Sequence, residues 1–200
     1  MKIVKSLLAT LGAAVLLGSL VSSASARSLS VDNQSLRFTF SSLRFHLPES
    51  TVDCPIILEG SLHRRTIPKV SGSLIGYITR AELGICPFGT ATILRETLPW
   101  HVRYHGFEGV LPNIGSIISH IINASFRIRS SAGVTCLVRS TAAEPAVGRF
   151  HRDVSNHLTV GIEGSIRTDP GCFGFAVSFR SDSPQVVLLG TLTAISLTLI

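Results

Sequence analysis

The residues that could do chemistry are most concentrated in one short segment, residues 99–105, which reads Pro-Trp-His-Val-Arg-Tyr-His. On an extended strand successive side chains point to opposite faces, so this segment separates into an apolar set and a cationic set. The cationic set is His101, Arg103 and His105, and together these side chains could hold a phosphate, sulfate or carboxylate group. The alternative is a solvated outer face that binds no ligand.

The same histidines do not predict a metal site. On a strand, His101 and His105 would lie about 13 Å apart, at roughly 3.3 Å per residue. A helix would bring them together, but Pro99 and the alternation favour a strand. We therefore expect no metal ion and no cofactor.

The short motifs that mark common enzyme classes are absent from the sequence. There is no G-x-S-x-G elbow, H-E-x-x-H motif, P-loop or G-x-G-x-x-G turn. Glu59, Glu108 and Glu163 lie in strand-like stretches and could form the carboxylate pair of a glycosidase, or be ordinary surface carboxylates. The catalytic residues of any enzyme are thus unknown, and a non-enzymatic module that binds an extracellular or cell-envelope ligand is favoured. A hydrolase with dispersed catalytic residues and a barrel that binds a small apolar ligand are the alternatives.

The elements that must position these residues are strands, because apolar and polar residues alternate along most of the chain. The alternation is clearest over residues 158–167, 173–180 and 36–47, and within the last segment it slips by one residue at Ser41-Ser42, which predicts a bulge or corner. Further strands are expected over residues 52–60, 73–80, 89–98, 100–111, 116–122, 124–129, 134–139 and 186–200.

The number and spacing of these strands predict the fold class. Roughly eleven short strands with regular turns indicate an all-β protein, and the connections are too short for parallel crossovers, so the strands are antiparallel. An antiparallel β-sandwich is the preferred architecture, and a closed up-and-down β-barrel is the alternative. Residues 140–156 show little periodicity and are expected to form a long loop.

The first 26 residues have the features of a cleavable signal peptide. Lys2 and Lys5 precede an uncharged apolar run, and Ala24-Ser25-Ala26 offers the small-x-small pattern that signal peptidase requires. The run is too short to span a bilayer comfortably. We expect a secreted protein with no membrane span after cleavage, in which residues 27–200 form a single domain.

The charge of the chain is mildly basic. Removal of residues 1–26 would lower the formal net charge from +6 to +4. The remaining basic residues are scattered singly, whereas nucleic-acid binding needs a clustered patch or stripe. Nucleic acid is therefore not an expected partner.

Four cysteines, all after residue 26, predict disulfides in an exported chain. Similar sequence separations and similar flanking residues favour the pairs Cys54–Cys86 and Cys136–Cys172 over the two other pairings. No C-x2-C spacing is present, so a zinc site is the weaker use of these thiols.

Several strings resemble a group of small secreted proteins of unknown function from high-GC Gram-positive soil bacteria. They are Gly-Thr-Ala-Thr-Ile-Leu at 89–94, Leu-Pro-Trp-His-Val-Arg-Tyr at 98–104, Leu-Pro-Asn-Ile at 111–114 and Leu-Leu-Gly-Thr at 188–191. The resemblance covers about residues 52–140 and the tail. It implies export, β structure and paired cysteines, and it supplies no activity.

Overall fold

The computed structural model describes residues 28–31, 34–47, 50–110, 113–152, 158–167, 176–186 and 197–199. These residues form fourteen strands and one short 3-10 helix, η1 (Arg95–Thr97). Every strand pairing is antiparallel. The expected all-β, antiparallel class is therefore confirmed.

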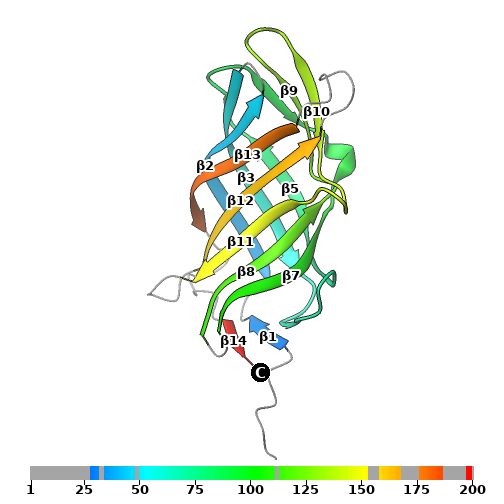
Figure 1. Cartoon of the computed structure of the whole chain (residues 1–200), viewed down its shortest axis with the longest axis vertical. Coiled ribbons are helices and arrows are strands. Elements are labelled where there is room, and N and C mark those ends of the chain that lie inside the picture. The colour runs from blue at the N-terminus through cyan, green and yellow to red at the C-terminus, as the bar shows by residue number, and fades with distance from the viewer. Residues whose placement is uncertain are drawn as a thin grey trace, which may run out of the picture.

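Eight of the strands form a closed barrel in which each strand pairs with the next one along the barrel (Figure 1). In chain order they are β2 (Ser35–Leu47), β3 (Ser50–Leu62), β5 (Leu74–Leu83), β7 (Trp100–Val110), β8 (Asn113–Ile122), β11 (Ala146–Arg152), β12 (Leu158–Arg167) and β13 (Ala176–Val186). The ring closes because β13 pairs with β2. The architecture of these eight strands is therefore the closed up-and-down barrel expected as the alternative, and not the preferred β-sandwich. Closure leaves this sheet no free edges.

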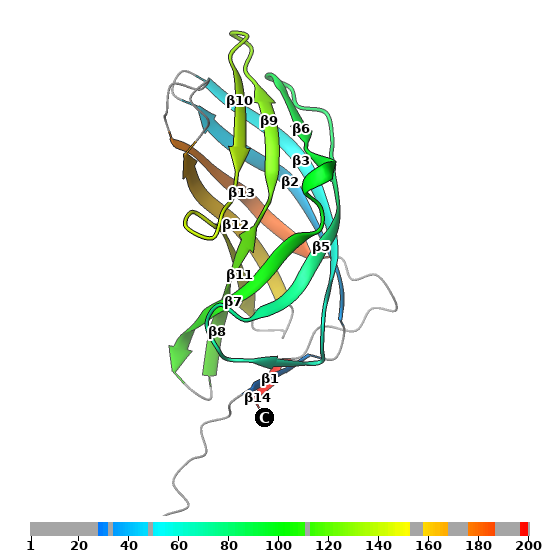
Figure 2. The same ribbon diagram turned by 90° about the vertical axis from the view of Figure 1, so that its right-hand side faces the viewer.

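Two three-stranded sheets lie at the two ends of the barrel (Figure 2). One contains β6 (Thr90–Ile93), β9 (Ser125–Arg129) and β10 (Thr135–Arg139). The chain leaves the barrel for this sheet at Asn123, whose φ of 73° turns the backbone between β8 and β9. The other contains β1 (Ser28–Val31), β4 (Thr66–Pro68) and β14 (Leu197–Leu199).

The alternation expected for the first long strand is present in β2. Phe40 and Phe45 are both fully buried, although an odd number of positions separates them. The register with β3 shifts between Phe40 and Leu43, so the bulge predicted at Ser41-Ser42 is confirmed. The bulge returns the apolar side chains to the interior after the slip in phase.

The β6–β9–β10 sheet shares the barrel's hydrophobic core. Phe126 of β9 packs against Phe45 at a ring-centroid distance of 5.3 Å and against Trp100 at 5.4 Å. Ile128 and Val138 on the same sheet are fully buried. This sheet therefore covers one end of the barrel with apolar side chains.

The loop expected over residues 140–156 is wrong in part, because β11 occupies Ala146–Arg152. Its buried positions include Ala146, which has a single methyl group, and Gly148, which has no Cβ, so they give almost no hydrophobic signal in the sequence. A Cβ at Gly148 would lie 2.7 Å from Oγ of Ser119 on β8, so the close strand packing depends on this glycine.

Candidate functional site

The cationic and apolar sets of residues 100–105 separate as predicted. Three side chains of β7 point into the core: Trp100, Val102 and Tyr104, with exposed fractions of 1%, 8% and 3%. On the opposite face, His101 and Arg103 are half-buried and His105 is exposed. The histidines and the arginine therefore lie on the outer wall of the barrel.

The beginning of β7 is held by its buried indole. Nε1 of Trp100 donates to Oγ1 of Thr97 in η1, at 3.0 Å, and the indole ring meets Phe126 edge to face. With Trp100 fixed inward, the next residue must point outward. The core packing thereby sets the direction of His101 and of the cationic side chains that follow it.

Neighbouring strands add further rings to this wall. Tyr77 on β5 is the cross-strand partner of His101, and their rings are 5.3 Å apart. The ring of His63, just after β3, lies 4.5 Å from that of Tyr77. On the other side, His120 of β8 is the cross-strand partner of Arg103.

His105 reaches His120 because the β7–β8 register shifts between Tyr104 and Gly106. The two imidazole rings stack, with centroids 4.0 Å apart and planes inclined by 20°. We call this surface the histidine face, and it consists of His63, Tyr77, His101, Arg103, His105 and His120.

Arg103 differs from the other arginines of the barrel strands whose side chains the structure describes. Four of these arginines contact a carboxylate: Arg37, Arg44, Arg80 and Arg149. Arg103 instead donates from Nη1 to the carbonyl oxygen of Gly72 at 3.1 Å, and its buried Nε has no hydrogen-bond partner. Within the described residues, its positive charge is therefore not neutralised by an acidic side chain.

Within the histidine face, the imidazole of His120 is biased toward its neutral form. Partial burial, and then the charge of His105, lower the pKa of His120 below its ordinary value of 6.5. Protonation of His120 would place positive charge against the stacked ring of His105 and beside the unneutralised guanidinium of Arg103. An anion bound among them would relieve that repulsion.

The three glutamates considered for a carboxylate pair fall into two groups. Glu108 and Glu163 both contact Arg149, at 2.5 and 2.8 Å, whereas Glu59 contacts Arg37 and Arg80 in a separate ion network. A hydrogen bond from Ser116, and then the nearby Arg149, hold the pKa of Glu108 below its usual value. A glycosidase acid needs a raised pKa, so the surroundings of Glu108 are opposite to those of a proton donor.

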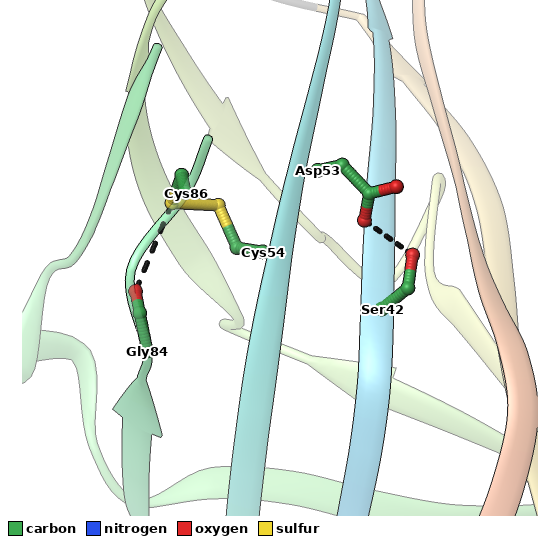
Figure 3. Close-up of a disulfide and its surroundings, with 5 residues drawn as sticks. All are labelled: Ser42, Asp53, Cys54, Gly84 and Cys86. Carbon is green, nitrogen blue, oxygen red and sulfur yellow. Dashed lines mark hydrogen bonds between the residues drawn. A yellow bond between two sulfur atoms is a disulfide. The ribbon is translucent and has the colours of Figure 1, made fainter. Parts of the chain in front are cut away.

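One of the two predicted disulfides is described directly. Sγ of Cys54 on β3 is bonded to Sγ of Cys86 in the segment after β5, with the two Cα atoms 4.5 Å apart (Figure 3). Beside it, Asp53 accepts hydrogen bonds from Ser42 and Arg44. Cys136 of β10 is buried and disulfide-bonded, and its predicted partner, Cys172, lies outside the described residues.

Apolar side chains line two small internal spaces among the described residues of the barrel. Two internal spaces, one around Phe38, Leu58 and Phe150 and one around Leu58, Trp100 and Val138, each have a volume of only about 20 Å³. That is about the space of one water molecule. A drug-sized ligand needs a pocket of at least about 300 Å³.

Comparisons with protein families, with curated proteins and with solved structures find no match to this chain. In the described segments, no three His, Cys, Asp or Glu side chains are grouped as metal ligands, and no helix is long and apolar enough to cross a membrane.

Sequence reasoning identified the β7 residues of the histidine face but not their neighbours. His120 lies in a segment expected to be a strand, and a period-two pattern gives its face. The pattern does not give the register that places it opposite Arg103 and stacks it on His105. The contact between the rings of His63 and Tyr77 likewise depends on how β3 and β5 are aligned, which a period-two pattern does not give.

Proposed function

We propose that this protein is an exported, non-enzymatic binding domain that holds an anionic group of an extracellular or cell-envelope ligand on the histidine face. The observation that carries the proposal is the guanidinium of Arg103, which has histidines beside it and no carboxylate in contact among the described residues. A phosphate, sulfate or carboxylate oxygen would supply the missing acceptor and counter-charge.

Two features support the proposed export. Residues 1–26 have the pattern of a signal peptide. The Cys54–Cys86 disulfide agrees with folding in an oxidising compartment, where such bonds persist. We infer that the domain works outside the cell or in its envelope.

The alternatives of hydrolysis and of apolar-ligand binding have less support. The Ser116 hydroxyl donates to Glu108 at 2.7 Å, but Ser116 is only 2% exposed, and a nucleophile must be reachable by its substrate. Oγ1 of Thr51 lies 3.5 Å from Nδ1 of His46, which is longer than the hydrogen bond between a nucleophile and its base. The two small internal spaces around Leu58, each of about 20 Å³ among the described residues, are too small for a drug-sized apolar ligand.

The proposal is tested by calorimetric titration of the purified domain with inorganic phosphate, with sulfate and with soluble anionic cell-wall polymers. We expect saturable binding that is lost in Arg103→Gln and weakened in Arg103→Lys, which keeps the charge but not the planar fork of donors. Arg80→Gln is the matched control, because Arg80 is already paired with Glu59 and Glu82. Binding unchanged by Arg103→Gln, or no binding to any anion, would overturn the proposal.

A further inference from the structure

The segment between β5 and β6 exposes two large apolar side chains. Ile85 is 91% exposed and Phe88 is 68% exposed. Cys86, between them, is bonded to the buried Cys54 of β3. The disulfide therefore holds the segment to the barrel while its apolar side chains face outward.

This segment leads directly into the β6–β9–β10 sheet. The φ of Gly89 is +115°, and a Cβ there would lie 2.6 Å from the carbonyl oxygen of Arg129, so the backbone after Phe88 passes close to β9. Thr90, the next residue, pairs with Arg129 in the β6–β9 register. Figure 2 shows that the segment before β6 and the β9–β10 hairpin reach the same end of the molecule.

The neighbouring sheet surface is positively charged. Arg127 and Arg129 of β9 and Arg139 of β10 are exposed, and within the described residues none of them forms an ion pair. Residues 84–94 and 125–139 contain no Asp or Glu. We call Ile85, Phe88, Arg127, Arg129 and Arg139 the apolar–basic end.

From this combination we infer a second binding surface, distinct from the histidine face: the apolar–basic end docks on an anionic lipid bilayer. Arginines are attracted to anionic headgroups, and exposed Ile and Phe side chains leave water when they enter the boundary between headgroups and acyl chains. A soluble polyanion would use the arginines but would gain little from Ile85 and Phe88. The two apolar side chains therefore favour the bilayer over a polymer.

The test is co-sedimentation of the purified domain with phosphatidylcholine vesicles that contain or lack phosphatidylglycerol. We expect binding only to the anionic vesicles, weakened by added salt. Ile85→Ser/Phe88→Ser should weaken this binding by about tenfold or more, since each apolar side chain loses its transfer into the interface. Arg127→Gln/Arg129→Gln should weaken it by roughly tenfold and reduce its dependence on salt.

Val70→Ser is the matched apolar control. Val70 is 62% exposed, but it precedes β5 whereas Ile85 follows it, so the two residues lie beyond opposite ends of that strand. All substituted side chains are exposed, and a thermal unfolding measurement on each variant is the check that it is folded.

The inference is overturned if the wild-type domain binds neither vesicle, or if Ile85→Ser/Phe88→Ser binds anionic vesicles as well as the wild type. The protein could instead bind soluble heparin equally well with and without Ile85→Ser/Phe88→Ser and bind no vesicles. That result would show that the arginines bind a soluble polyanion and not a bilayer. The protein could also self-associate, lose this association in Ile85→Ser/Phe88→Ser and bind no vesicles. That result would show that the apolar–basic end is an interface between two copies of the chain.

Discussion

The imidazole rings of His105 and His120 stack on the outer wall of the barrel, with centroids 4.0 Å apart and planes inclined by 20°. The stack depends on a register shift in β7, and it stands beside the guanidinium of Arg103, the cross-strand partner of His120. Three groups that can carry positive charge are thus held together by neighbouring strands of one sheet. Their response to pH and to anions follows from that arrangement.

The stability of the protein should fall as the pH decreases from 6.5 toward the lowered pKa of His120. The pKa of His120 in the folded protein is below its ordinary value of 6.5, so between these two values the unfolded chain binds more protons than the folded one. Stability therefore rises with pH in that window, and the contribution of His120 is fully present above 6.5. Urea unfolding midpoints measured across the window should show this slope.

His120→Asn is the variant that isolates this contribution. It removes the titrating ring, so it should flatten the slope of stability against pH. His46→Asn serves as a control, because His46 lies on β2, outside the histidine face. An equal slope in wild type and His120→Asn would contradict the assignment.

Sulfate binding should strengthen as the pH falls through the lowered pKa of His120, because the protonated ring adds positive charge beside Arg103 while sulfate keeps its own charge. In the bound state the anion should in turn raise the pKa of His120, since an opposite charge favours the protonated ring. NMR titration of the His120 ring resonances, with and without sulfate, measures both effects. Affinity that is constant across this pH range would show that the imidazoles take no part.

Removal of the Cys54–Cys86 disulfide should lower the free energy of unfolding by about 3–4 kcal/mol. The bond spans 32 positions, and on the chain-entropy model a loop of that size restricts the unfolded chain by this amount. The variant Cys54→Ala/Cys86→Ala avoids leaving a buried thiol opposite an empty site. Chemical denaturation compares it with the wild type, and a loss below about 1 kcal/mol would contradict the expectation.

Gly60→Ala should destabilise the barrel by about 3 kcal/mol or more. A Cβ at Gly60 on β3 would lie only 2.2 Å from the carbonyl oxygen of Tyr77 on β5, and backbone atoms cannot move aside cheaply. Gly106→Ala is the matched control, because a Cβ there meets nothing within 4 Å. Equal unfolding midpoints for the two variants would show that β3 and β5 approach less closely.

Much of the fold could be predicted from the sequence because burial alternates along strands. Period-two patterns predict which side chains of β7 point inward, beginning with Trp100, and which point outward, beginning with His101. They also predict the bulge in β2. Strand β11 was missed since Ala146 and Gly148 bury little apolar surface. The closure of the barrel could not be read either, because alternation gives the face of each residue but not its partner strand.

The candidate site could be predicted only in part, because alternation along a strand gives the face on which each side chain lies but not its neighbours on other strands. A single strand shows His101, Arg103 and His105 on one face. The stacking of His105 on His120 and the lack of a carboxylate at Arg103 depend on register and on side-chain contacts between strands. These are properties of the folded sheet.

The central claim, that Arg103 holds an anion, is tested most directly by following its Nε–Hε resonance during titration with phosphate. We expect a saturable shift of this resonance and of the His120 ring signals, with the resonances of Arg80 and Arg149 unchanged. A shift of the same size at all exposed arginines, or none at Arg103, would contradict it.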